Sequence, residues 1–181
     1  YIDNWRWGGI PFYIRTGKML PTRVTEIVIH FQPTPHHLFS DDPDIIRQQN
    51  QLVIRIQPDE GLLLKFGMKV PGAGVDIQNV NMDFKYSDLA HTRIPTAYER
   101  LLLDCMLGDA TLYARADAVE AAWRIVTPIL QVWKEQSDIP LYGYAAGSWG
   151  PREARNIFED PQMDWRYPCE SLVSEDKSHK L

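Results

Sequence analysis

Alternation of apolar and polar residues dominates the first half of the chain. Between residues 10 and 86, apolar side chains recur at every second position, and clusters of Pro, Gly and Asn separate the runs. A period of two is typical of β-strands. The pattern predicts strands at residues 10–15, 24–31, 51–58, 62–70 and 80–86.

Each predicted strand divides its side chains between two faces. We expect the more apolar face to point inward. In residues 62–70 that face carries Leu62, Leu64, Phe66 and Met68, and the other carries Lys65 and Lys69. Because short turns join these strands without intervening helices, the pattern predicts an antiparallel sheet with one face covered.

The period changes to that of an α-helix after Pro95. A first helix is predicted at 96–107, where Thr96 and Glu99 have the spacing of a capping box. Gly108 follows the last periodic residue and is typical of a helix end.

A second helix is predicted at 117–136, with Asp117 and Glu120 again at capping-box spacing. Pro128 is expected to kink this helix without ending it. A third, short helix is predicted to begin with Pro151 at its first position. Strands followed by helices predict an α+β fold, with a large, mainly antiparallel sheet and helices packed on one face.

Composition and charge narrow the classes of function. At 181 residues the chain has the size of one domain, and its formal net charge of -5 argues against binding to nucleic acid through phosphates. No apolar stretch approaches the roughly 20 residues that span a bilayer, so we expect no membrane partner. Cys105 and Cys169 have no disulfide-like or metal-like spacing. We therefore expect a reducing, cytoplasmic location.

Metal and nucleotide motifs are not recognisable in the sequence. His36 and His37 are adjacent, with only Asp41 and Asp42 near them in sequence, and we interpret them as surface histidines. No glycine-rich phosphate-binding motif opens a strand–helix unit. We expect no metal site.

The stretch "RTGKMLP", residues 15–21, is the strongest candidate for contact with an anion. After the predicted strand at 10–15, Gly17 permits a tight turn and places Lys18 at the strand's end, and Arg23 follows. Lysine and arginine suit a phosphate or sugar hydroxyls. From the residues alone, two interpretations remain open: a solvated basic turn and a ligand site.

The order of the longer motifs resembles a known family. The stretches "IDNWRWGGIPFYIRTGKMLP", "NQLVIRIQPDEGLLLKFGMKVPG", "AYERLLLDCMLGDATLYARADAVEAAWRIVTPIL" and "YAAGSWGPREA" resemble the C-terminal domain of bacterial-type glucose-6-phosphate dehydrogenase. The resemblance covers nearly the whole chain. It implies that residues 1–181 are a C-terminal substrate-binding and dimerisation domain, without the N-terminal dinucleotide-binding domain.

The resemblance also implies an activity. In that family the enzyme oxidises D-glucose 6-phosphate to 6-phosphogluconolactone with NADP, in the oxidative pentose phosphate pathway. It implies substrate contacts by Lys18, Arg23 and Gln57, and a role for Lys18 in orienting the sugar. The catalytic His and Asp and most of the NADP site are expected upstream of the chain. We therefore expect no catalytic residue in this fragment and no activity from it alone.

Some members of the family bind a second, structural NADP in this domain. Arg15, Arg55 and Lys65 match parts of that cluster. However, Val24, Val28 and Trp149 stand where that site has basic residues, and Leu63 stands where it has a tyrosine. Because three cations are missing, a phosphate would be poorly neutralised. We predict no tight structural NADP site.

The expected partners are glucose 6-phosphate and a second copy of the chain. The resemblance implies a dimer through the sheet, and a homodimer and a homotetramer both remain open. A different class of function also remains open, namely a stand-alone dimerising scaffold or sugar-phosphate-binding module. A dinucleotide fingerprint upstream of Tyr1 would favour the enzyme.

Overall fold

The backbone forms two compact units in a computed structural model that describes residues 1–33, 49–72, 74, 76–89, 95–161 and 163–168. The first unit is Tyr1–Leu89 with Gly143–Leu181, and the second is Ala90–Tyr142. Each unit is described by itself. The histidine and aspartate pairs at 36–37 and 41–42 lie outside the described residues.

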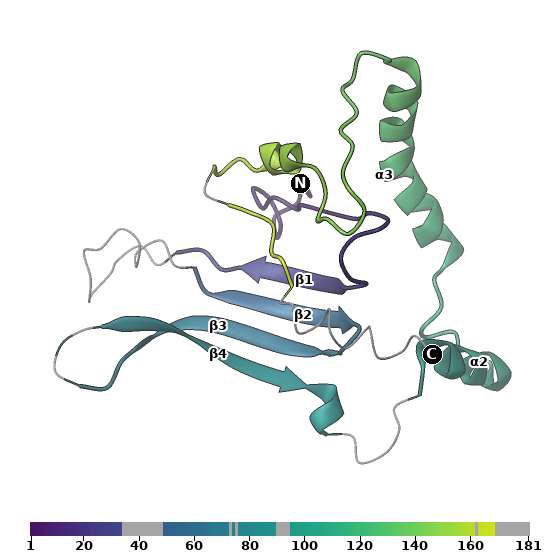
Figure 1. Cartoon of the computed structure of the whole chain (residues 1–181). Helices are drawn as coiled ribbons and strands as arrows, with labels where there is room; N and C mark the ends of the chain where they lie inside the picture. The colour runs from purple at the N-terminus through teal and green to yellow at the C-terminus, as the bar shows by residue number, and fades with distance from the viewer. Residues whose placement is uncertain (34–48, 73, 75, 90–94, 162, 169–181) are drawn as a thin grey trace. The chain divides into compact units, whose positions relative to one another are not determined.

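A four-stranded antiparallel sheet is the main element of the first unit (Figure 1). Its strands are β1 (Thr25–His30), β2 (Gln51–Gln57), β3 (Gly61–Lys69) and β4 (Ile77–Lys85), and they lie side by side in chain order. A short 3₁₀ helix, η1 (Tyr86–Asp88), follows β4. The predicted antiparallel sheet is confirmed, and these four strands lie close to their predicted places.

The prediction of a strand at residues 10–15 is wrong. These residues form no regular secondary structure, and Pro11 has no N–H to donate to a neighbouring strand. Aromatic packing holds the stretch instead. The ring of Tyr13 lies edge-on to Phe158, with 4.7 Å between centroids, and Phe158 in turn contacts Trp165 at 5.0 Å. Contacts with a distant part of the chain have therefore replaced strand pairing.

The register gathers apolar side chains on one face of the sheet, as predicted. A cross-strand row contains Ile27, Ile54, Leu62 and Phe84. In the first unit, however, this face is open, since Ile27 is 50% exposed and Leu62 is 38% exposed. The expectation that it points inward is wrong for this unit.

The buried centre of the sheet lies on its other face. Val53 on β2 is fully buried and Leu63, its partner on β3, is 8% exposed. Non-strand segments of the same unit cover this face, because Arg166 forms an ion pair with Glu26 of β1. Alternation therefore identifies which side chains share a face, but packing by coil segments decides which face is covered.

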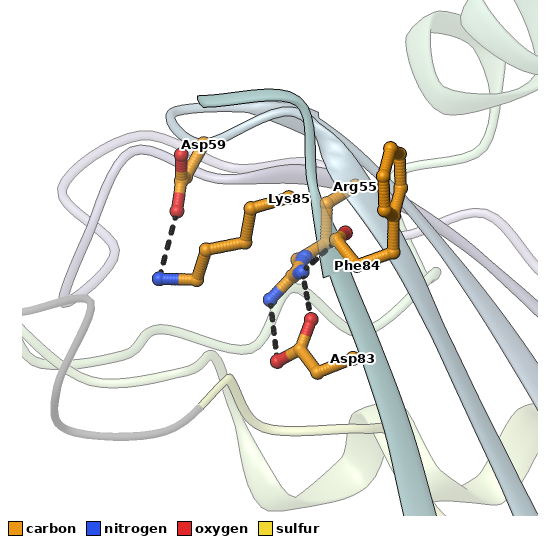
Figure 2. A network of polar contacts seen from close by, with 5 residues as sticks. All are labelled: Arg55, Asp59, Asp83, Phe84 and Lys85. Carbon is orange, nitrogen blue, oxygen red and sulfur yellow. Dashed lines mark hydrogen bonds and ion pairs between the residues drawn. The ribbon is translucent and has the colours of Figure 1, made fainter. Parts of the chain in front are cut away.

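An arginine side chain crosses the sheet at one end (Figure 2). Arg55 of β2 reaches over β3 to β4, where it pairs with the carboxylate of Asp83 and donates to the carbonyl oxygen of Phe84 at 3.2 Å. The residue of β3 opposite Arg55 is Gly61. A Cβ there would lie 2.8 Å from Nη2 of Arg55 and closer still to the Phe84 carbonyl oxygen. Glycine is required because the side chain and the strand both pass through that space.

The turn between β2 and β3 is tied to β4 as well. Nζ of Lys85 lies 3.1 Å from a carboxylate oxygen of Asp59 (Figure 2). The backbone N–H of Tyr86 donates to the carbonyl of Glu60 at 3.0 Å. Three strands and one turn are therefore joined at this end of the sheet.

The second unit contains the two α-helices, α2 (Ala97–Leu107) and α3 (Ala116–Glu135). The capping box of α2 is confirmed, since Thr96 and Glu99 bond to each other's backbone N–H. Gly108 ends the helix in the left-handed conformation, with φ of 73°. With both helices and sheet present, the α+β class is confirmed, while helix packing on one face of the sheet stays a prediction.

The predicted cap of α3 is wrong. The helix begins at Ala116, so Asp117 lies within its first turn instead of preceding it. There the Asp117 carboxylate pairs with Arg115 at 2.7 Å. A carboxylate is favourable in a first turn because it faces the positive end of the helix dipole. Pro128 lies inside the helix without ending it, as predicted.

The third predicted helix is a 3₁₀ helix, η2 (Arg152–Ile157), in the first unit. Pro151 is its N-cap residue and not its first helical residue. The fixed φ of proline suits both positions.

We expect the substitution Gly61→Ala to lower the free energy of unfolding by roughly 1–3 kcal/mol, the range for overpacking. The added methyl group would push apart the Arg55 side chain and the backbone of β4. Urea unfolding followed by tryptophan fluorescence measures the change. Gly143→Ala is the matched control, because a Cβ at Gly143 meets no atom within 4 Å. Equal unfolding midpoints for the two variants would contradict this account of the crossing.

Candidate functional site

The backbone bends at Lys18 and Met19. The hydroxyl of Tyr144 donates to the carbonyl oxygen of Lys18 at 2.6 Å. The N–H of Gly147 donates to the carbonyl oxygen of Met19 at 2.8 Å. The Lys18 side chain is exposed, and among the described residues its ammonium group makes no hydrogen bond or ion pair. The backbone is thus held while the charge is available to a ligand.

Two other predicted substrate residues lie at one end of the sheet. Arg23 is exposed and lies two residues before β1. Gln57, also exposed, is the last residue of β2, and its partner on β1 is Thr25, the first residue of that strand. The start of β1 and the end of β2 therefore place Arg23 and Gln57 at the same end of the sheet, and a shared contact with one ligand stays a prediction.

Arg15 has a different environment from Lys18, although only two residues separate them. Its guanidinium carbon lies between 4.9 and 5.3 Å from the ring centroids of Trp165, Trp149 and Tyr167. Nη2 donates to the carbonyl oxygen of Arg166 at 2.9 Å. Burial among these rings lowers the pKa of Arg15 from its ordinary value. Cation–π attraction compensates part of the cost of burying the charge.

The three cations matched to a structural nucleotide site have different surroundings. Arg15 is enclosed by aromatic rings, and Arg55 is 9% exposed and paired with Asp83. Lys65 lies opposite Gln51 on β2 and four residues beyond Gly61 along β3. Two of the three cations already have protein partners, so a nucleotide phosphate would have to break those contacts. These contacts support the expectation of no tight structural NADP site, which stays a prediction.

Sequence reasoning missed Tyr144 and the full extent of the aromatic group around Arg15. The clusters "YGYAAGSWGP" and "DWRYP" carried a signal, because aromatic residues recur in them. They were interpreted as packing residues, and the rings of Trp149, Trp165 and Tyr167 do pack on Arg15. The partner of each aromatic residue could not be inferred, because the contacts span more than 100 residues of sequence.

Two features are absent from the described part of the chain. No group of three or more His, Cys, Asp or Glu side chains there is arranged to hold a metal ion. Among its helices, none has both the length and the apolar character needed to cross a bilayer.

The first unit is built on an antiparallel sheet, with the exposed residues Arg23 and Gln57 at one end of it. Comparison with known proteins identifies the family. Residues 1–166 match the family model described as "Glucose-6-phosphate dehydrogenase, C-terminal domain". The chain belongs to this family, which confirms the resemblance seen in the sequence.

Individual relatives agree with the family model. A glucose-6-phosphate 1-dehydrogenase of Treponema pallidum is 52% identical over 182 residues, covering 100% of this chain and 35% of the relative. One from Aggregatibacter actinomycetemcomitans is 57% identical over 167 residues, covering 92% of this chain and 33% of the relative. The chain therefore spans about a third of the length of the curated relatives it matches.

Solved structures agree as well. The glucose-6-phosphate 1-dehydrogenase from Mycobacterium avium matches with a TM-score of 0.72 and 35% identity, over 93% of this chain and 34% of that one. A glucose-6-phosphate dehydrogenase in complex with its substrate glucose-6-phosphate matches with a TM-score of 0.67 and 33% identity, over 83% of this chain and 30% of that one.

We expect NADP to leave the melting temperature of this chain unchanged within about 1 °C. A ligand present at 100 times its dissociation constant stabilises the folded state by about 2.7 kcal/mol, which would be easy to detect. Differential scanning fluorimetry with increasing NADP tests this, with sodium phosphate at equal ionic strength as the control. A rise of several degrees would mean that the Arg15 and Arg55 contacts rearrange to admit the nucleotide.

Proposed function

We propose that this chain is the substrate-contacting and dimerising part of a glucose-6-phosphate dehydrogenase, which oxidises D-glucose 6-phosphate with NADP. The observation that carries the proposal is the family match over residues 1–166, together with an exposed, backbone-anchored Lys18. The solved relative that matches with a TM-score of 0.67 is described as a complex with glucose-6-phosphate. A sugar phosphate is a suitable ligand for the exposed cations Lys18 and Arg23.

In this proposal Lys18, Arg23 and Gln57 orient the substrate. The ammonium group of Lys18 supplies up to three hydrogen-bond donors, and the guanidinium of Arg23 suits two phosphate oxygens at once. The Gln57 amide both donates and accepts, as a sugar hydroxyl requires. Holding the ring in one orientation reduces the entropy lost on reaching the transition state for hydride transfer.

Proton abstraction and cofactor binding belong elsewhere in this proposal. A preceding dinucleotide-binding domain supplies the base and most of the NADP site. NADP bound there would supply the hydride acceptor for the oxidation. The present chain contributes orientation and exclusion of water, and we expect no oxidation of glucose 6-phosphate by residues 1–181 alone.

The substitution Lys18→Ala in the complete enzyme should raise the KM for glucose 6-phosphate by roughly 10- to 100-fold, as expected for loss of a charged hydrogen bond. The KM for NADP should change by less than about twofold, since Lys18 contacts the sugar. Steady-state kinetics with each substrate varied in turn measures both. Lys134→Ala, in the last turn of α3, is the control and should leave both constants unchanged. Equal rises in the two constants after Lys18→Ala would indicate a structural role.

We also propose that the open apolar face of the sheet is covered by the same face of a second copy. Its exposed side chains include Ile27, Ile29, Leu62, Met68, Met82 and Phe84. A contiguous apolar face of this kind is uncommon on a monomer and typical of an interface between subunits. A homodimer needs one such interface, and a homotetramer needs a further one.

Met82→Glu should convert the dimer to a monomer in sedimentation velocity at tens of micromolar. Met82 is 62% exposed in the first unit, so a charge there does not disturb folding but would be buried without a partner in the interface. Asn81→Glu places the same charge on the opposite face of β4 and should leave the dimer intact. A monomeric wild-type chain, or equal behaviour of the two variants, would argue against this interface.

A further inference from the structure

The backbone of the turn that carries Lys18 is unusual. Met19 has a φ of 54°, and in the part of the chain that the structure describes it is the one residue other than glycine with a positive φ. This left-handed conformation is unfavourable for a residue with a Cβ. Such residues persist where surrounding contacts hold them, and they concentrate at places that bind ligands. The contacts that hold Met19 therefore bear on the adjacent Lys18.

Those contacts come from one short segment far away in the sequence. The Tyr144 hydroxyl binds the carbonyl of Lys18, and the Gly147 N–H binds the carbonyl of Met19. Two successive carbonyls are thus held by the stretch 144–147, which we call the carbonyl clasp. Fixing both carbonyls fixes the peptide planes that follow Lys18 and Met19, and hence the direction in which the lysine side chain leaves the backbone.

The carbonyl clasp is itself rigid. Its last residue, Gly147, has a φ of 80°, and the N–H of Ser148 donates to the carbonyl of Ala145 at 3.1 Å. The Ser148 hydroxyl donates to the same oxygen at 2.7 Å. A turn closed by these bonds holds its own shape and can therefore impose a conformation on the segment that it binds.

Gly17 provides the space in which the tyrosine hydroxyl approaches the turn. A Cβ at Gly17 would lie 3.1 Å from the hydroxyl oxygen of Tyr144 and 3.4 Å from Cδ2 of Leu20. The glycine of "RTGKMLP" is thus explained by the approach of Tyr144, in addition to the turn itself. The segment that carries Lys18 and the carbonyl clasp are therefore complementary in shape. An incidental surface contact would not require a glycine at position 17.

We infer that Tyr144 is a positioning residue for the substrate site: its hydroxyl holds the Lys18 carbonyl so that the lysine ammonium points at the sugar phosphate. The inference rests on the proposed role of Lys18. A lysine side chain is long and flexible, so an unanchored turn would let the ammonium sample many positions and lose affinity for one substrate pose.

Kinetics of the complete enzyme test the link to the substrate. Tyr144→Phe should raise the KM for glucose 6-phosphate about three- to tenfold, the factor that one hydrogen bond is worth. kcat and the KM for NADP should stay within about twofold, since the chemistry and the cofactor are not touched. Tyr142→Phe, two residues earlier, is the matched control and should behave as the wild type. A KM for glucose 6-phosphate that does not respond to Tyr144→Phe overturns the inference.

A double-mutant cycle separates a positioning role of Tyr144 from a general loss of structure. If Tyr144 acts through Lys18, adding Tyr144→Phe to Lys18→Ala should raise the KM for glucose 6-phosphate no further. If the two substitutions instead multiply each other's effect on the KM for glucose 6-phosphate, Tyr144 acts by another route, and the inference is overturned. An unchanged KM after Lys18→Ala alone would instead contradict the substrate role of Lys18 in the proposed function.

Amide hydrogen exchange tests the clasp without any substrate. In the chain of residues 1–181, the Gly147 N–H should exchange about two- to tenfold faster in Tyr144→Phe than in Tyr142→Phe, because its bond to Met19 loses the neighbouring anchor. Equal exchange rates in the two variants would overturn the inference even if the enzyme oxidises glucose 6-phosphate. Faster exchange in Tyr144→Phe, together with a complete enzyme that does not oxidise glucose 6-phosphate, would support the clasp and contradict the proposed function alone.

Discussion

Arg55 crosses the sheet from β2 to β4, and the end of the sheet that bears the candidate site depends on that crossing. Its guanidinium passes over Gly61 to reach Asp83 (Figure 2). Gln57 lies two residues beyond Arg55, past the last pair between β2 and β3. β3 offers Gln57 no partner, so the position of this residue depends on its pairing with Thr25 of β1 and on the strands joined just before it. Gly61 allows this crossing because it has no side chain to block the Arg55 guanidinium.

The cations of the first unit divide into two groups by their surroundings. Arg15 and Arg55 are used within the protein, one among aromatic rings and one in an ion pair. Lys18 and Arg23 are exposed. A buried cation that contacts protein groups is less accessible to a phosphate, whereas an exposed one exchanges only water. Arg15 and Lys18 lie close together in sequence, yet burial gives them different chemistry.

Prediction from sequence succeeded where the interactions are local. The capping box of α2 needs only Thr96 and its neighbour three residues later, and the alternation along β3 needs only the pleat of one strand. It failed where distant segments compete. Residues 10–15 do not pair as a strand, because Tyr13 packs on Phe158. Coil segments cover the face of the sheet that includes Val53.

For the stretch "RTGKMLP", the sequence by itself determined a glycine turn with two cations and, through its long matching context, the family. The tertiary structure decided which cation is exposed and what holds it. Arg15 is enclosed by rings contributed from residues 149–167, and Lys18 is anchored by Tyr144. The physical reason is that burial and hydrogen bonding depend on groups brought together from opposite ends of the chain, and no spacing within seven residues encodes that meeting.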